Sequence, residues 1–197
     1  MNLADKLTIS RIGLTFVILS ILLIPWEDFG LVWPSFYVNG SIVVESKYIV
    51  AGVLFIIACI TDYLDGKIAR KAKKTTDFGA TLDAIADKIL VNGILIVLAY
   101  QGFISVLIPV IIVLRDTFVD ALRVLSAKNK VIIKANKWGK VKTIFMMVAL
   151  SLVLFYNLPF EIWGIYMAEI LLSIATILSV LSGIIYYIQF RDKIKWD

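Results

Sequence analysis

The sequence has no histidine and a single cysteine, Cys59. Without histidine, the chain lacks the commonest general base and the usual ligand of catalytic zinc, copper or non-haem iron. One cysteine can form neither an intramolecular disulfide nor a cysteine zinc site, and the apolar neighbours of Cys59 indicate that it packs in a core. Any catalysis must therefore use carboxylates, lysines or hydroxyls.

Charged residues are also scarce. They make up 18% of the 197 residues, whereas hydrophobic residues make up 60% and the mean hydropathy is +0.91. These values are typical of an integral membrane protein rather than a soluble domain. No Pro/Gly/Ser-rich linker, low-complexity tract or repeat divides the chain, so we expect one membrane domain over residues 1–197.

Six apolar segments are candidates for membrane spans. The first is short, but Trp26, Glu27 and Asp28 follow it where a signal peptide would have a small-residue cleavage site, so we expect it to be retained. The alternation typical of a β-barrel is absent, which predicts an all-α polytopic protein with six transmembrane helices. The segments are residues 12–26, 48–69, 81–100, 103–127, 141–157 and 162–190.

The basic residues alternate with the apolar segments. They gather at residues 6–11, 67–74, 128–142 and 191–195, whereas the intervening loops are acidic and carry one basic residue, Lys47. This asymmetry predicts that both termini are cytoplasmic and that the chain is a multi-pass protein of the cell membrane. The net charge of +5 then faces anionic lipid headgroups, and we expect no nucleic-acid partner.

Four aspartates interrupt the apolar pattern where the second segment ends and the third begins. Asp62 and Asp65 are three residues apart and Asp83 and Asp87 four, so each pair shares one helix face, and the short loop brings the pairs together. Four neighbouring carboxylates repel strongly in a low dielectric. Two Mg²⁺ or Mn²⁺ ions, roughly 4 Å apart, would offset this repulsion and bind a phosphate-bearing substrate.

The residues beside these aspartates suit a diphosphate. Gly66 permits close approach of the backbone, Ala69 keeps the next helical turn slim, and Arg70 can bind phosphate oxygens. The alternative is that the aspartates form structural ion pairs with Lys67, Arg70 and Lys88 at the membrane surface. Carboxylates within a membrane rarely serve structure alone, which favours the metal site.

The pattern Asp62-x-x-Asp65-Gly66-x-x-Ala69-Arg70, then eight residues, then Gly79-x-x-x-Asp83-x-x-x-Asp87, resembles the complete signature of the CDP-alcohol phosphotransferase family. The resemblance implies a six-helix membrane fold, usually a homodimer. It also implies transfer of the phosphatidyl group of CDP-diacylglycerol to an alcohol, with release of CMP. Direct attack of the alcohol on phosphorus is favoured over a covalent enzyme intermediate.

The same resemblance implies roles for the signature residues. Asp87 would both meet the metal and accept the proton of the alcohol. The metal ligands would be Asp62, Asp65, Asp83 and Asp87. The CDP contacts would be Asp62, Asp65, Gly66, Ala69, Arg70 and Gly79.

A second polar group lies in the fourth segment. Arg115, Asp116, Asp120 and Arg123 fall within about 140° of a helical wheel and should point into the bundle. Lysines at the start of the fifth segment follow them, and such cations suit an acceptor that carries its own phosphate. The alternative assigns the lysines to topology and snorkelling, and the two aspartates to structural pairing with the arginines.

Residues 115–123 and 138–143, with residues 2–11, are similar to the phosphatidylglycerophosphate synthase branch of the family. That branch uses glycerol 3-phosphate as acceptor, and commonly has glutamate where this chain has Asp116. The phosphate cage implied by this resemblance is Arg115, Arg123, Lys140 and Lys142.

Thr8 and Arg11 share one face of the first helix. They could contact the cytidine or the diphosphate of CDP. The alternative is an N-cap threonine and an arginine at the membrane interface.

Competing functions differ in what they require of the sequence. Another acceptor within the family, namely inositol phosphate, serine or phosphatidylglycerol, is compatible with the same signature, because few polar contacts set acceptor choice. A divalent cation transporter would need acidic residues through the middle of the second and third segments, where none occur. The sequence therefore favours an enzyme that uses CDP-diacylglycerol and glycerol 3-phosphate at the cytoplasmic face.

Overall fold

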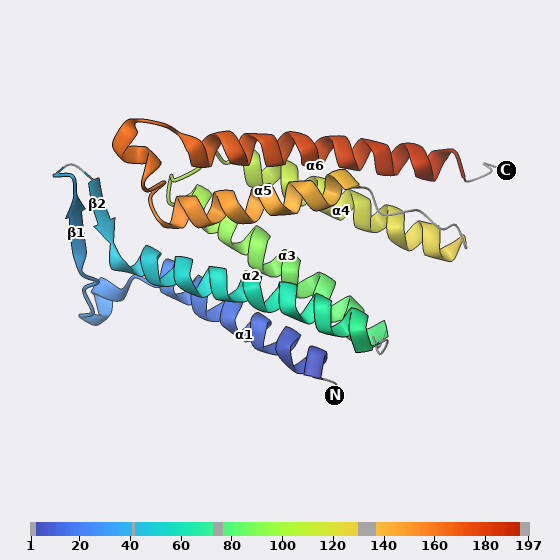
Figure 1. Ribbon diagram of the computed structural model, residues 1–197, viewed down its shortest axis with the longest axis horizontal. Helices are drawn as coiled ribbons and strands as arrows, with labels where there is room; N and C mark the ends of the chain where they lie inside the picture. Colours follow the sequence, from blue (N-terminus) through green and yellow to red (C-terminus); the bar gives the residue numbers. More distant parts are fainter. Residues whose placement is uncertain (1–2, 41, 73–76, 130–136, 194–197) are drawn as a thin grey trace.

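The computed structural model describes residues 3–40, 42–72, 77–129 and 137–193, and within them no side chain is described at 3–6, 64–72, 77, 78, 80 and 137. The described residues are mostly helical, and helices α1 to α6 run side by side along the long axis (Figure 1). The helices are α1 (Leu3–Leu23), α2 (Ser46–Ala72), α3 (Asp77–Tyr100), α4 (Leu107–Lys128), α5 (Lys137–Leu154) and α6 (Met167–Arg191). Two short 3-10 helices, η1 (Trp26–Phe29) and η2 (Phe160–Trp163), and two strands, β1 (Ser35–Val38) and β2 (Ile42–Glu45), complete the described elements.

Consecutive helices run in opposite directions. The start of α1, the end of α2, the start of α3 and the end of α6 lie at one end of the bundle, which we call the terminal end (Figure 1). The strands lie at the opposite, hairpin end. Short connections between apolar helices favour this antiparallel order. The prediction of six helices is confirmed for the described part of the chain.

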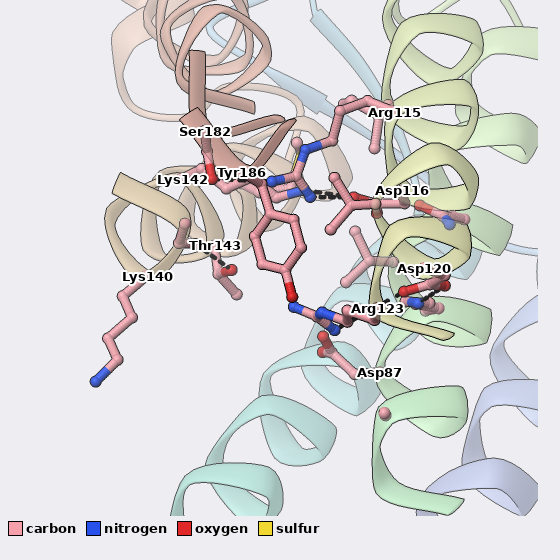
Figure 2. A pocket seen from close by; sticks show the side chains of 18 residues that line it. Asp87, Arg115, Asp116, Asp120, Arg123, Lys140, Lys142, Thr143, Ser182 and Tyr186 are labelled. Atoms are coloured by element: carbon pink, nitrogen blue, oxygen red, sulfur yellow. Dashed lines mark hydrogen bonds and ion pairs between the residues drawn. The ribbon is translucent and has the colours of Figure 1, made fainter. Parts of the chain in front are cut away.

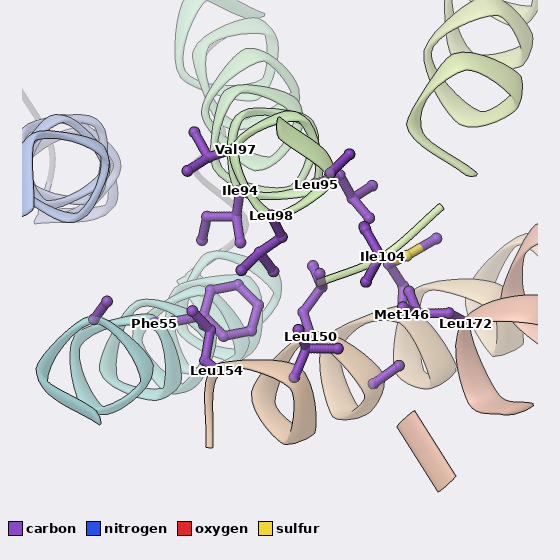
Figure 3. Close-up of a cluster of buried hydrophobic side chains, with 14 of the residues drawn as sticks. Phe55, Ile94, Leu95, Val97, Leu98, Ile104, Met146, Leu150, Leu154 and Leu172 are labelled. Atoms are coloured by element: carbon purple, nitrogen blue, oxygen red, sulfur yellow. The ribbon is translucent and has the colours of Figure 1, made fainter. Parts of the chain in front are cut away.

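The helices form two groups of three. α1 packs against α2 and α3, and α6 packs against α4 and α5, with less contact between the groups. The main core draws on all six helices, and Phe55, Ile94 and Leu150 meet in it where the groups face each other (Figure 3). Each is at most 1% exposed, so close van der Waals packing joins the two groups here. A smaller apolar cluster, formed by Val119, Leu122, Tyr186 and Phe190, joins α4 to α6 alone.

The segment between the first two helices contains a β-hairpin that was not predicted from the sequence. β1 pairs antiparallel with β2, with Ser35 opposite Glu45. The turn between them has Asn39 and Gly40 at φ of 53° and 72°. Asn-Gly flanked by apolar residues is a strong hairpin signal, because both residues tolerate positive φ, and it would have revealed this turn.

The hairpin is attached to the bundle by aromatic contacts. The backbone N–H of Glu45 donates a hydrogen bond to the Tyr156 hydroxyl at 3.1 Å. The Tyr156 ring lies edge-on to the rings of Tyr48 and Phe103, with centroids 5.5 and 5.6 Å away. These contacts fix β2 against the start of α2 and the end of α5.

Two of the described helices are long and apolar enough to cross a membrane, through Ser46–Tyr63 of α2 and Met167–Arg191 of α6, and Leu7–Leu23 is a shorter apolar stretch. The boundaries also differ from the expected segments. α1 begins at Leu3 rather than at residue 12, because its polar first turns are helical too. α6 begins at Met167 rather than at 162, since η2 ends at Gly164 in the left-handed conformation.

Candidate active site

Three helices bring an arginine and two of the predicted aspartates together near the terminal end. Arg11 of α1 is 1% exposed, and its Nη1 lies 2.6 Å from Asp62 Oδ1 and 2.9 Å from Asp83 Oδ1. Asp62 belongs to α2 and Asp83 to α3. One guanidinium therefore links carboxylates from two helices and offsets their mutual repulsion.

This geometry corrects one of the two alternatives for the first helix. Thr8 lies inside α1, which begins at Leu3, and it is 3% exposed. It is therefore not an N-cap, and the buried Arg11 is not an interfacial arginine. Both side chains face the interior, where Arg11 meets the carboxylates of α2 and α3.

Part of the signature falls on residues whose side chains are not described. Asp65, Gly66, Ala69 and Arg70 lie in α2, and their expected contacts, like those of Lys67, lie outside the described side chains. Gly79 lies in the first turn of α3 and is partly exposed. Among the described side chains, no three carboxylates are arranged to hold a metal ion.

A cavity of about 290 Å³ lies between α3, α4, α5 and α6 in the terminal half of the bundle (Figure 2). Asp87 lines it from α3, and among the described side chains it has no ion-pair partner. Lys88, next to Asp87, forms an ion pair with Asp120 of α4. Lys88 therefore pairs with Asp120 of α4 and not with Asp62, Asp83 or Asp87, whereas the side chains of Asp65, Lys67 and Arg70 lie outside the described part.

The opposite wall of the cavity carries two partly buried cations that share one carboxylate. Asp116 Oδ1 lies 2.8 Å from Arg115 Nη1 and 2.9 Å from Lys142 Nζ. All three side chains are at most 15% exposed. The structure thus joins two members of the predicted phosphate cage, and Asp116 is their structural partner.

The other two predicted cage residues are placed differently. Arg123 is more than half exposed, 3.8 Å from Asp120, with its guanidinium over the Tyr186 ring at 5.7 Å. Lys140 borders the cavity, but it is exposed and its side chain points away from the other labelled residues (Figure 2). The four cations therefore do not form one closed cage in this structure.

Sequence reasoning missed the contribution of α6. Ser182 and Tyr186 line the cavity from this helix, and the carbonyl of Ser179 accepts a hydrogen bond from Arg115 Nε at 2.9 Å. Residues spaced three or four apart share a helix face. The serines and the glycine at this spacing in an otherwise apolar helix were the sequence signal that could have indicated a polar face on α6.

The site thus has an acidic part on α2 and α3 and a basic part on α4 and α5, with a cavity sized for a small molecule at their boundary. The partly buried Arg115 and Lys142 suit an anionic group, and guanidinium binds phosphate oxygens especially well. The nearby Asp87 carboxylate can accept a proton from a hydroxyl group placed in the same cavity.

Comparison with known proteins agrees with this chemistry. The chain belongs to the CDP-alcohol phosphatidyltransferase family, whose model matches residues 1–183. It is 34% identical to the CDP-diacylglycerol–glycerol-3-phosphate 3-phosphatidyltransferase of Bacillus subtilis, over 98% of this chain and 97% of the relative. The enzyme of the same name from Haemophilus influenzae is 40% identical, over 78% of this chain and 83% of the relative. The one from Mycoplasma pneumoniae is 36% identical, over 82% of this chain and 76% of the relative.

A solved structure shares the fold. The crystal structure of Mycobacterium tuberculosis phosphatidylinositol phosphate synthase, in its apo form, aligns with a TM-score of 0.60 over 95% of this chain and 88% of that chain, at 16% sequence identity. The predicted family and the helical bundle are therefore both confirmed.

Proposed function

We propose that this chain transfers the phosphatidyl group of CDP-diacylglycerol to glycerol 3-phosphate, giving phosphatidylglycerophosphate and CMP. The observation that carries the proposal is one cavity lined by Asp87 on α3 and by the Arg115–Asp116–Lys142 group on α4 and α5. The curated relatives named for this reaction, which match most of the chain, support it.

The reaction places one task on each part of the site. Of the phosphate cage predicted from the sequence, Arg115 and Lys142 are proposed to hold the phosphate of the acceptor, whereas Arg123 and Lys140 lie at the exposed edge of the same cavity. Its hydroxyl oxygen forms a bond to the phosphorus that bears the diacylglycerol group, while the bond from that phosphorus to CMP breaks. Asp87 accepts the proton that the hydroxyl group loses. Because Asp87 and Lys142 line the same cavity, one small acceptor can contact both.

The CDP group is assigned to the acidic part of the site. Arg11 already lies between Asp62 and Asp83, and a diphosphate brought there would meet its guanidinium group. The proposed CDP contacts are Thr8, Arg11, Asp62, Asp65, Gly66, Ala69, Arg70 and Gly79.

Divalent metal is part of the proposal, and the family is generally dependent on it. Asp62 and Asp83 converge on one positive charge, and carboxylate oxygens are preferred ligands of Mg²⁺ and Mn²⁺, so the donor set fits such an ion. The proposed ligands are Asp62, Asp65, Asp83 and Asp87. Two ions bound there would neutralise negative charge that develops on the diphosphate. CMP release that persists after chelation by EDTA would contradict this assignment.

The test of the reaction is CMP release by purified protein in detergent with CDP-diacylglycerol and magnesium. The acceptors to compare are glycerol 3-phosphate, inositol phosphate, inositol, serine and phosphatidylglycerol. We expect CMP with glycerol 3-phosphate alone. CMP with another acceptor would keep the family and reject the acceptor assignment, whereas no CMP from folded protein would favour the alternative of a divalent cation transporter.

We also propose that all six helices span the cell membrane within a single domain, residues 1–197, with both termini and the active site on the cytoplasmic side. The alternating helix directions and the basic terminal end support this orientation. In a Cys59→Ala background, a membrane-impermeant maleimide should label Asn39→Cys but not Lys193→Cys in intact cells. The opposite pattern would reverse the orientation.

A homodimer, implied by the family resemblance, should appear on cross-linking in native membranes.

A further inference from the structure

Arg115 is held by α6 as well as by Asp116. Its Nε donates to the Ser179 carbonyl at 2.9 Å, and its Nη2 donates to the Ser182 hydroxyl at 2.9 Å. With Nη1 bound to Asp116 at 2.8 Å, all three guanidinium nitrogens have a fixed partner. The plane of this cation is therefore set by two helices before any ligand arrives.

A glycine makes room for the arginine on the same face of α6. A Cβ atom added at Gly183 would lie 3.1 Å from Arg115 Cγ and 3.3 Å from Nε, closer than ordinary contacts. The chain packs the Arg115 side chain directly over the backbone of α6 at this point. A larger residue would push the Arg115 side chain aside by a few tenths of an ångström.

The second cation, Lys142, contacts the same helix. Lys142 Nζ lies 3.2 Å from the Ser179 hydroxyl and 2.9 Å from Asp116 Oδ1. Lys142 belongs to α5 and Asp116 to α4. Ser179 therefore contacts both cations, through its carbonyl and its hydroxyl group, and α6 connects the two helices that carry them.

We propose that Ser179, Ser182 and Gly183, which we call the α6 clamp, are positioning residues that hold Arg115 and Lys142 in place for the phosphate of the acceptor. This inference rests on the proposed function, since it concerns the same cavity. A cation fixed in advance loses less side-chain freedom when its ligand binds, and its free N–H bonds already point in one direction. The clamp therefore acts on acceptor affinity and not on the bond-breaking step.

The test compares Ser182→Ala and Gly183→Ala with the wild-type protein in the CMP-release assay. Loss of the Ser182 hydrogen bond is expected to raise the KM for glycerol 3-phosphate about tenfold, the factor for one charged hydrogen bond. The kcat should change less than about twofold, as expected when binding alone is weakened. The KM for CDP-diacylglycerol should not change. Gly183→Ala should raise the acceptor KM in the same way.

Two further variants separate positioning from structure. Ser182→Thr keeps the hydroxyl group and should restore the wild-type KM. Thr176→Val, on the same helix, removes a buried hydroxyl that bonds the Leu172 carbonyl of α6 at 2.8 Å, and it should leave both KM values unchanged. An unchanged acceptor KM in folded Ser182→Ala and Gly183→Ala would overturn the proposal. A parallel loss of kcat and of both affinities would overturn it as well.

A binding measurement distinguishes this inference from the reaction itself. Wild-type protein should bind inorganic phosphate in calorimetry more tightly than Ser182→Ala does. If the wild type releases no CMP with glycerol 3-phosphate but this difference is observed, the proposed reaction fails and the clamp stands. Equal phosphate binding by the two proteins would overturn the clamp.

Discussion

Asp87→Asn is expected to lower CMP release by about 10²–10⁴-fold, the range that a general base contributes. Asparagine has nearly the same shape but cannot accept the proton of the acceptor hydroxyl. The fold should be preserved, because Asp87 forms no ion pair with another described side chain, and the repulsion from Asp62 and Asp83 opposes the attraction of Arg11. Turnover in detergent, with glycerol 3-phosphate and CDP-diacylglycerol both saturating, is the measurement.

Two controls make this prediction specific. Asp192→Asn, at the exposed end of α6, removes a carboxylate far from the cavity and should retain full activity. Folded Asp87→Asn should still bind CDP-diacylglycerol, which shows that the loss lies in the reaction step. Full turnover by Asp87→Asn would reject its assignment as the base.

Arg11→Ala is the second variant with a large expected effect, this time on stability. The substitution leaves Asp62 and Asp83 near each other without the cation that lies 2.6 and 2.9 Å from them. Removing one partner of a fully buried pair costs about 3–5 kcal/mol. Because Asp62 and Asp83 are 31% and 49% exposed, we expect a loss between that value and the roughly 1 kcal/mol of an exposed pair. Unfolding by SDS in mixed micelles would measure this loss, and added Mg²⁺ should recover part of it by binding the same carboxylates.

The matched control is Arg191→Ala. Arg191 also pairs with an aspartate, Asp192 at 3.1 Å, but both side chains are more than half exposed. Exposed pairs contribute at most about 1 kcal/mol, so this variant should resemble the wild type. Equal stability of the Arg11 and Arg191 variants would show that Arg11 is not the main counter-charge of the two carboxylates.

Much of this architecture follows from local patterns. Apolar length and the absence of strand alternation indicated six helices, and helical periodicity placed Arg115 and Asp116 at the cavity. The same periodicity put Asp83 and Asp87 on one face of α3. These features depend on residues at most a few turns apart, which is the range over which a helical pattern is informative.

The remaining features depend on contacts between distant segments. Arg11 and Asp83 are 72 residues apart, and no periodicity within α1 identifies the partner of its arginine. The α6 clamp was missed for a related reason. Small residues in an apolar helix such as α6 can equally allow close helix packing, and only the position of Arg115 shows what Ser182 and Gly183 contact.

The lysines show a different limit. The sequence analysis assigned Lys140 and Lys142 to one phosphate cage. In the structure, Lys142 is 11% exposed and paired with Asp116, whereas Lys140 is exposed. Residues two apart on a helix point in different directions. Assigning a whole basic run to one anion overestimates how many of its members can reach it.

The contacts between the two helix groups differ along the bundle. Toward the hairpin end, close apolar packing joins them, and a Cβ atom at Gly52 of α2 would lie 3.0 Å from the Phe155 ring. Around the cavity, the smaller apolar cluster is confined to α4 and α6, and the ion pair between Lys88 and Asp120 crosses from one group to the other. Close packing over many atoms holds membrane helices together, whereas one partly exposed ion pair contributes at most about 1 kcal/mol. Separating α3 from α4 around the cavity therefore breaks mainly polar contacts, so a small change in the spacing of these two helices should cost less free energy there than at the hairpin end.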